Sequence, residues 1–359
     1  MASPFDQLTF MHGPAMSNRF MLAPLTNQQS HADGTLSDEE LHWLRVRAQG
    51  GFGLTMTCAA HVQAVGQGFA GQLGIWGDGH LEGLGRLADA LNATGTVSYA
   101  QLHHAGNRAP AALIGTQPVC SSDDPSTGAR ALTTAEVHEV ASDFVAAARR
   151  AQQAGFHGVE LHGAHGYLLC QFLSADLNQR TDEYGGSLEN RSRLLFEIVA
   201  GIRSECGDGL ALAVRLSPER FGMRIAEIVE VYERLVATGE VDMIDMSLWD
   251  IDRCSDEAGF EGRPLMEIFA ELPRGDARLG VAGKIHDPVD VQRVLERGVD
   301  IAVLGRVAIL HHDYPQLLAA DSGFVPRRPP VAAEVLAGEG VSPNFVQYLA
   351  TSFKGFVDG

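Results

Sequence analysis

The sequence has few basic residues and few cysteines, and each shortage excludes classes of protein. Lys and Arg number 27 against 45 Asp and Glu, for a formal net charge of −18 at pH 7. No Lys/Arg-rich run is present, so nucleic acid and anionic membrane surfaces are poor partners. The five cysteines are scattered and include no C-x-x-C pair. They therefore indicate neither a disulfide framework nor a structural zinc or iron–sulfur site, and reduced thiols in a cytoplasmic protein are expected.

Long apolar runs are also absent. No uninterrupted run approaches the ~18 residues that a bilayer-spanning helix needs. The first ten residues lack the basic segment and apolar core of a secretory signal. Hydrophobic residues make up 45% and charged residues 20% of the 359, as in ordinary globular proteins. The length allows either two domains of usual size or one large α/β barrel.

Short apolar runs alternate with amphipathic stretches along most of the chain, which is typical of a parallel sheet with helical crossovers. We expect eight strands, at residues 19–23, 54–58, 96–101, 158–162, 211–216, 243–247, 279–282 and 301–304. Helices are expected at 81–93, 188–203, 225–238, 264–272 and 288–297, the last closed by Gly298. Two more are expected to begin at capping boxes, formed by Ser37 with Glu40 and by Thr133 with Glu136.

Eight strands, each followed by a helix, predict an α/β fold, a (β/α)₈ TIM barrel in one domain whose body covers about residues 19–320. The remaining residues are expected outside the barrel. Residues 3–18 are predicted to form a small N-terminal lid. Residues 102–132 are rich in Pro, Ser, Asp and Gly, and this long loop after the third strand is predicted to be a mobile flap. Residues 163–187 and the C-terminal extension 321–359 make up the rest.

The polar residues at the strand ends are the functional candidates, because barrels of this kind place their chemistry at the C-terminal ends of the strands. Arg215 shares a strand face with Ala211 and Ala213, so it points into the barrel. It forms either an internal ion pair, with Glu160 of the adjacent strand, or a fixed positive charge beneath an anionic ligand.

Gly283, Gly305 and Arg306 follow the seventh and eighth strands. The two glycines either only turn the chain into the next helices or allow the backbone to approach a ligand closely. The neighbouring guanidinium of Arg306 favours a phosphate site.

His162 and His165 admit three interpretations. They form a metal pair, they are structural histidines, or they are neutral donors that bind a carbonyl or phenolate oxygen. In the third case Tyr167, two residues further on, is placed to donate a proton to the same substrate.

These residues, in this order, resemble the Old Yellow Enzyme family of NADH:flavin oxidoreductases, which are FMN-dependent ene-reductases. The most specific stretch covers residues 157–199 and contains HGAHGYL and RTDEYGGSLENR. NRFMLAPLTNQQS, QLHHAGNRA and VLGR agree with the family at corresponding places. The resemblance extends over about residues 5–320.

The resemblance implies noncovalent FMN at the barrel mouth, with NADH or NADPH as the reductant. The implied cofactor contacts are Pro24, Leu25 and Thr26 along the flavin, Ala59 and Gln101 at its pyrimidine half, Arg215 at N1/O2, and Gly283, Gly305 and Arg306 at the phosphate. Thr26 is expected near the flavin O4/N5 edge. His162, at the flavin, and His165 would bind the substrate oxygen, and Tyr167 would protonate Cα after hydride passes from N5 to Cβ.

The implied reaction is a ping-pong reduction of the C=C bond of an α,β-unsaturated carbonyl or nitro compound. The chain departs from the family at two points: Thr26 stands where one subgroup has a cysteine, and Asn107, followed by Arg108, stands where arginine is frequent. Another flavin barrel of the dehydrogenase or demethylase type, a ligand-binding barrel and a histidine-dependent metallohydrolase remain alternatives. The aromatic tail, residues 341–356, is expected to pack on the barrel or on a partner subunit, and a homodimer is expected.

Overall fold

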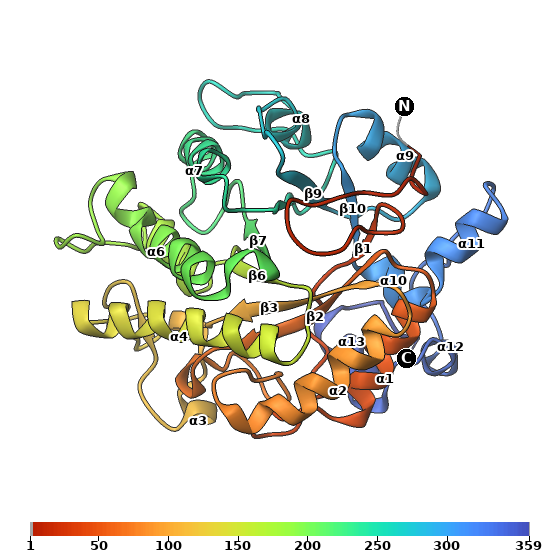
Figure 1. The fold of residues 1–359 in the computed structure, drawn as a ribbon, viewed down its shortest axis with the longest axis horizontal. Coiled ribbons are helices and arrows are strands. Elements are labelled where there is room, and N and C mark those ends of the chain that lie inside the picture. The colour runs from red at the N-terminus through yellow and green to blue at the C-terminus, as the bar shows by residue number, and fades with distance from the viewer. Residues whose placement is uncertain (1–2, 359) are drawn as a thin grey trace.

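Eight parallel strands close into a barrel, as predicted. A computed structural model describes residues 3–358. The strands follow one another around the barrel in the order β1-β10-β9-β8-β7-β6-β3-β2, with the helices outside them (Figure 1). Their bounds are β1 Phe20–Leu22, β2 Leu54–His61, β3 Val97–His103, β6 Gly158–Gly163, β7 Ala211–Leu216, β8 Met243–Ser247, β9 Arg278–Ala282 and β10 Ile301–Leu304. Each predicted strand is present, and β2 and β3 continue furthest beyond their predicted ends.

The helices that follow barrel strands are α1 Asp38–Gln49, α2 Leu81–Asn92, α4 Thr134–Gln153, α6 Leu188–Cys206, α7 Ile225–Thr238, α8 Leu265–Ala270, α9 Pro288–Glu296 and α10 Arg306–Leu310. Further helices are α5 Leu168–Leu173, α11 Tyr314–Ala320, α12 Ala333–Gly338 and α13 Pro343–Ser352. The five helices with predicted ranges, α2, α6, α7, α8 and α9, agree with them to within a few residues, and α1 and α4 begin at the two predicted N-caps. Gly298 has the expected positive φ, +90°, just after α9.

One of the two predicted capping boxes is wrong. Thr133 and Glu136 form a complete box at the start of α4. At α1 the Ser37 side chain accepts from the Glu40 backbone N–H, but the Glu40 side chain does not reach back. Its carboxylate is fully buried and bonds to Ser30 and Asn27 instead. The Glu40 carboxylate therefore accepts hydrogen bonds from the loop after β1 and does not cap the start of α1.

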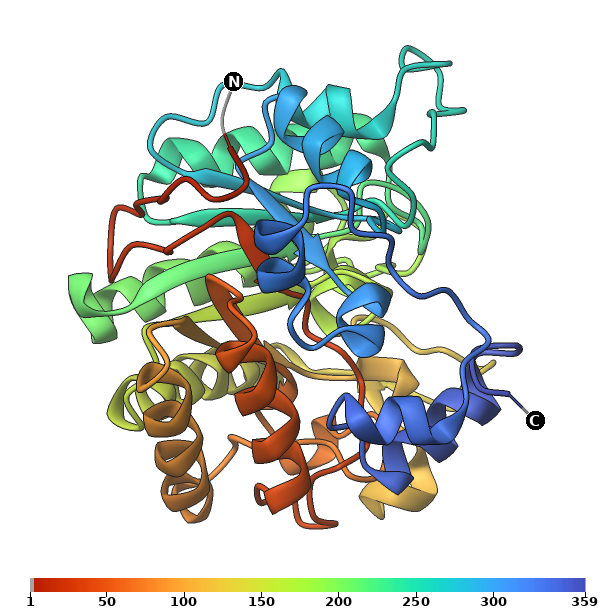
Figure 2. The ribbon, with the colours of Figure 1, turned by 90° about the vertical axis from the view of Figure 1, so that its right-hand side faces the viewer.

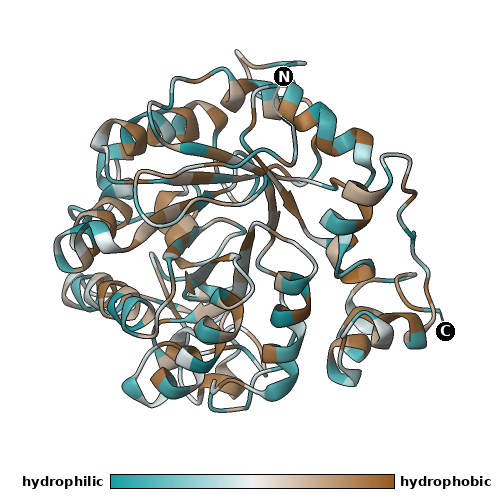
Figure 3. Ribbon diagram, turned by 45° about the vertical axis from the view of Figure 1, so that its right-hand side comes forward, coloured by the Kyte–Doolittle hydropathy of each residue, from teal (hydrophilic) through white to brown (hydrophobic). Residues whose placement is uncertain are grey.

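The barrel strands separate two hydrophobic cores. Outward-facing side chains such as Leu161 and Val214 pack under the helices, which gives the apolar inner layer and polar outer faces seen in Figure 3. Inward-facing side chains such as Ala213 and Met243 fill the amino-terminal end of the barrel. The N-terminal residues close that end, because Leu8 and Met16 pair in an antiparallel bridge and join the same inner core. The predicted lid lies there, opposite the end where the strands finish.

The long loop 102–132 is structured. It holds the short helix α3 (Ala111–Ile114) and a two-stranded sheet of β4 (Val119–Cys120) and β5 (Arg130–Ala131). Ser121 anchors it by donating from Oγ to the Gln171 carbonyl of α5, at 3.1 Å. The predicted mobility of this loop remains a prediction, while its position over α5 is defined.

The C-terminal residues pack on their own barrel. Phe345 of α13 is buried and meets Trp43 of α1 edge to face, with ring centroids 4.9 Å apart. Figure 2 shows the segment, in blue, running down one side of the barrel. The expected homodimer remains a prediction. Within residues 3–358 no helix has the length and apolarity that crossing a membrane requires, and all five cysteines are free.

Candidate active site

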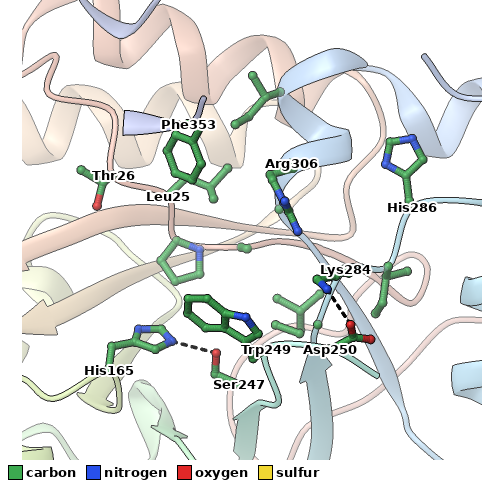
Figure 4. A pocket seen from close by; sticks show the side chains of 18 of the residues that line it. Leu25, Thr26, His165, Ser247, Trp249, Asp250, Lys284, His286, Arg306 and Phe353 are labelled. Atoms are coloured by element: carbon green, nitrogen blue, oxygen red, sulfur yellow. Dashed lines mark hydrogen bonds and ion pairs between the residues drawn. The ribbon is translucent and has the colours of Figure 1, made fainter. Parts of the chain in front are cut away.

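All of the predicted site residues line one cavity of about 860 Å³ at the carboxyl ends of the strands. This volume lies within the usual range for cofactor and ligand sites. The shared lining consists of Pro24, Leu25, Thr26, Ala59, Gln101, His162, His165, Tyr167, Arg215, Gly283, Gly305 and Arg306. Figure 4 shows part of this wall, with His165 and Thr26 on one side and Arg306 on the other. The barrel thus brings residues as far apart in the chain as Pro24 and Arg306 into one cavity.

Arg215 pairs with Asp245, not with Glu160, so the predicted partner is wrong. The Arg215 Nε lies 3.1 Å from Asp245 Oδ2 without hydrogen-bond alignment, and both side chains are buried. The strand register explains the choice, because Arg215 stands directly beside Asp245 on β8 while Glu160 stands beside Ala213. Glu160 instead accepts a hydrogen bond from Gln101 Nε2 at 2.7 Å.

Two buried carboxylates therefore lie near the Arg215 guanidinium beneath the cavity, and one of them is paired with it. Burial, and then the charge of Asp245, raise the pKa of Glu160 to about 8, while Arg215 opposes the shift. Burial also raises the pKa of Asp245. Glu160 Oε2 and both Asp245 oxygens have no hydrogen-bond partner within the described residues. The cluster holds a proton at neutral pH, and the positive charge of Arg215 remains beside the cavity.

Glu160 determines the orientation of the Gln101 side chain. Its amide nitrogen donates to the Glu160 carboxylate, so its carbonyl oxygen is left for the cavity that Gln101 lines. The assignment of the amide ends follows from this hydrogen bond.

His162 and His165 face one another through one nitrogen each. His162 Nε2 and His165 Nδ1 are 3.3 Å apart. The Ala164 backbone N–H donates to His162 Nδ1, which assigns the His162 proton to Nε2. Ser247 Oγ lies 2.8 Å from His165 Nε2. When the serine hydroxyl donates there, the His165 proton moves to Nδ1, and both facing nitrogens can donate to one oxygen atom.

Both histidines are neutral at physiological pH. Burial, and then His165, His103 and Arg215, lower the pKa of His162 far below its usual value. Burial, and then Arg215 and Arg108, lower the pKa of His165 to about 3. Neutral rings can donate hydrogen bonds without losing a proton to the ligand.

Tyr167 reaches the cavity because two residues before it turn the chain sharply. His165 and Gly166 both have positive φ, 61° and 72°. A Cβ at Gly166 would lie 2.8 Å from Phe221 Cδ1, so glycine is required there. The Tyr167 ring stands edge-on to His162, with centroids 5.1 Å apart. Its hydroxyl has no hydrogen-bond partner elsewhere in residues 3–358 and is free for a ligand.

The opposite end of the cavity is cationic. Arg306, at the start of α10, lines the cavity without a hydrogen bond or ion pair to any described residue. Lys284, beside it in Figure 4, is paired with Asp250 at 2.6 Å. A Cβ at Gly305 would make only an ordinary contact with Leu25. A Cβ at Gly283 would lie 3.0 Å from the Ile251 backbone, so that glycine serves the close approach of the loop after β8.

Several lining residues were not predicted. Ser247 ends β8, and the strand-end rule that found His162 would also have found it. Trp249 is 55% exposed on the rim, where the Arg220 guanidinium lies 4.4 Å from its ring centroid. Phe345, Tyr348 and Phe353 of the tail cover one side, and no local sequence signal indicates that the tail crosses the mouth.

The metal interpretation of the histidines finds no support in the geometry. Within the described part of the chain, the one cluster of three metal-ligating side chains is His312, Asp313 and Glu339. No third ligand joins His162 and His165 there, and a structural or catalytic zinc site needs at least three protein ligands.

The (β/α)₈ barrel, with a guanidinium at each end of its cavity and a neutral histidine pair in the same cavity, fits the flavin-binding oxidoreductase barrels. The chain belongs to the NADH:flavin oxidoreductase / NADH oxidase family, whose family model matches residues 5–321. The resemblance to Old Yellow Enzyme is thereby confirmed. FMN is the cofactor of this family, with NADH or NADPH as the reductant.

The chain is similar to several members over most of its length. It is 36% identical over 312 residues to a probable NADH-dependent flavin oxidoreductase of Bacillus subtilis, covering 84% of each chain. It is 34% identical over 323 residues to an NADPH dehydrogenase of Bacillus pumilus, covering 87% of this chain and 93% of that one. The old yellow enzyme homologue of Zymomonas mobilis superposes with a TM-score of 0.81 at 26% identity, covering 96% and 99%.

Replacing Glu160 by Gln should flatten the pH dependence of stability. With its folded-state pKa raised to about 8, Glu160 holds its proton in the folded protein while the unfolded chain releases it above its ordinary pKa. The free energy of unfolding therefore falls as pH rises toward 8, by up to about 1.4 kcal/mol per pH unit from this group. Urea unfolding at pH 5.5 and 8 measures it. The exposed-site variant Glu233→Gln is the control, and a slope in Glu160→Gln as steep as in the wild type would contradict the assignment.

Replacing Ser247 by Ala should weaken the binding of phenols. The variant leaves His165 Nε2 without its hydroxyl partner, so the tautomer with a proton on Nδ1 is no longer favoured. We expect the Kd of a phenolic ligand, from a spectral titration of the flavin, to rise about fivefold. Ser217→Ala removes a hydroxyl that accepts from the His165 backbone and is the matched control. An unchanged Kd in Ser247→Ala would remove Ser247 from this role.

Proposed function

We propose that this protein is an ene-reductase that uses FMN and NADH or NADPH to reduce the C=C bond of α,β-unsaturated carbonyl or nitro compounds. The observation that carries the proposal is the facing nitrogen pair of His162 and His165, 3.3 Å apart, beside the free hydroxyl of Tyr167 in one cavity. This arrangement offers two donors to a substrate oxygen and one proton to a neighbouring carbon.

The residues present fit FMN. Its flat ring system suits the apolar floor formed by Ala23, Pro24 and Val303. Its phosphate suits Arg306, which has no partner of its own within residues 3–358. Gln101 offers a carbonyl oxygen, and Arg215 offers a buried positive charge at the other end. When bound, the flavin accepts hydride from the nicotinamide and passes it to the alkene.

The histidine pair holds and polarises the substrate. Two neutral N–H donors on one carbonyl or nitro oxygen draw electron density from the conjugated C=C bond, so its β carbon becomes a better hydride acceptor. Burial and the charge of Arg215 keep the pKa of each ring low, so both histidines are neutral when the substrate binds. The pair also determines which face of the alkene would be turned toward the bound flavin.

Tyr167 supplies the proton. Its hydroxyl lies on the same wall as the histidine pair, so it can reach the carbon next to the activating group. The O–H bond breaks as the C–H bond at Cα forms. The half-buried position of Tyr167 lets water restore the proton before the next turnover.

The test of the reaction class is a spectrum of the purified protein under nitrogen. A flavin spectrum that bleaches with NADPH or NADH and returns on addition of 2-cyclohexenone would support the ene-reductase. A flavin that bleaches but is not reoxidised by any electron-poor alkene would favour a dehydrogenase or demethylase. A protein that binds no FMN would overturn the proposal.

Replacing Tyr167 by Phe should separate the two half-reactions. Oxidation of the reduced enzyme by 2-cyclohexenone should slow by about 10²-fold, because only that half needs the proton. Reduction by NAD(P)H, followed by stopped-flow absorbance, should change by less than about twofold. Equal losses in both halves would show that Tyr167 is not the proton donor.

Replacing Arg306 by Ala should weaken FMN retention. Loss of its charge-assisted hydrogen bonds to a phosphate should raise the Kd by at least about tenfold. FMN fluorescence on dilution measures the Kd. Arg293→Ala is the control, since Arg293 lines the same cavity but is already paired with Asp252 at 2.7 Å. A larger effect of Arg293→Ala would place the phosphate elsewhere.

A further inference from the structure

Arg108 lies against the ring of Tyr167. Its guanidinium carbon is 4.6 Å from the Tyr167 ring centroid, and its Nη1 donates to the His165 carbonyl oxygen at 2.6 Å. Arg108 is exposed and is not among the residues that line the cavity. Arg108 therefore contacts His165 and Tyr167, which line the cavity, and does not itself face the cavity.

The loop that carries Arg108 is bound to the helix that follows Tyr167. Asn107 donates from Nδ2 to Asp124 at 2.8 Å and accepts from Gln171 Nε2 at 2.6 Å. Gln171, on α5, also donates to the Gly166 carbonyl at 2.8 Å. A Cβ at Gly106 would lie 2.2 Å from Gln171 Oε1, so glycine permits this approach. Arg108 and Tyr167 thus belong to one hydrogen-bonded unit.

Arg108 supplies the positive charge in contact with Tyr167. It has no ion pair with any carboxylate in residues 3–358, although the chain carries 45 acidic residues. The other rings around Tyr167 are His103, with centroids 4.3 Å apart, and His162. Burial lowers the pKa of both histidines far below the usual range, so both are neutral.

The His103 proton is also placed by its surroundings. Gln72 Nε2 lies 3.0 Å from His103 Nδ1, while Gln72 Oε1 accepts from the Gly68 backbone. The Gln72 amide therefore donates to Nδ1, and His103 carries its proton on Nε2. His103 therefore packs against Tyr167 as an uncharged ring and brings no positive charge to the tyrosine.

We propose that Arg108 is a positioning residue for proton transfer, which holds the Tyr167 ring and stabilises the phenolate formed when its proton goes to the substrate. In that step the O–H bond breaks and its electron pair stays on the phenolate oxygen. The proton bonds to Cα through the electron pair that the C=C bond leaves there when hydride adds at Cβ. Water then returns a proton to the oxygen. A guanidinium against the ring favours the anion over the neutral phenol, because the charge that develops is of opposite sign. The proposal rests on the proposed function of Tyr167.

The test uses Arg108→Met, which keeps much of the side-chain length without the charge, and Arg108→Lys, which keeps the charge. Each is made in the FMN-loaded wild type and in Tyr167→Phe, and the two half-reactions are followed separately. Arg108→Met should slow oxidation by 2-cyclohexenone about tenfold and change reduction by NAD(P)H by less than about twofold. Arg108→Lys should recover most of the loss. In the Tyr167→Phe background Arg108→Met should cause no further loss.

Arg234→Met is the matched control, because the Arg234 guanidinium lies 4.7 Å from the Phe196 ring on the outer helices, away from the cavity. It should leave both half-reactions unchanged. A loss from Arg108→Met that persists in Tyr167→Phe, or that Lys does not recover, would overturn the role of the charge. If Tyr167→Phe itself leaves alkene reduction intact, the proposed function of Tyr167 fails. If Tyr167→Phe slows alkene reduction and Arg108→Met does not, only the role of Arg108 fails.

Discussion

The site depends on one buried ion pair, Arg215 with Asp245, inside the barrel. A guanidinium in the interior is tolerated only beside a carboxylate, and the register of β7 on β8 makes that carboxylate Asp245. The second acid, Glu160, is left to keep its proton and to orient Gln101. The same positive charge, added to burial, helps to keep His162 and His165 neutral. Burial is the main cause of each of these pKa shifts, and the charges of this ion pair modify them.

Backbone strain is present at three residues that line the same cavity. His165, Trp249 and Lys284 are non-glycine residues with positive φ, at 61°, 67° and 55°, and all three line it. Such conformations cost on the order of 1–3 kcal/mol each and persist only where the surroundings hold them. Here the barrel holds the strand ends in place, while Leu8 and Met16 of the N-terminal lid pack into the opposite end of the barrel. A rigid barrel, packed at one end, can thus hold strained turns at the other end, where ligands bind.

Neutral histidines suit the chemistry proposed for this cavity. A histidine with an ordinary pKa would be partly protonated near neutral pH, and binding would then vary with pH. Burial removes that variation for His162 and His165, and Ser247 can direct the proton of His165 to the nitrogen that faces His162. The tail residues Tyr348 and Phe353 add an apolar side to the same cavity.

The sequence by itself determined the barrel and many of the residues that line its main cavity. Two-residue alternation placed Arg215 inside, because side-chain direction in a strand follows from local geometry alone. The strand-end rule collected His162, His165 and Arg306, and the family resemblance added Gln101. Only the tertiary structure decided that Arg215 pairs with Asp245, that Glu40 turns inward and that the tail covers the mouth. Those outcomes depend on strand register, on burial and on the path of a distant segment, which bring together residues with no local relation in the chain.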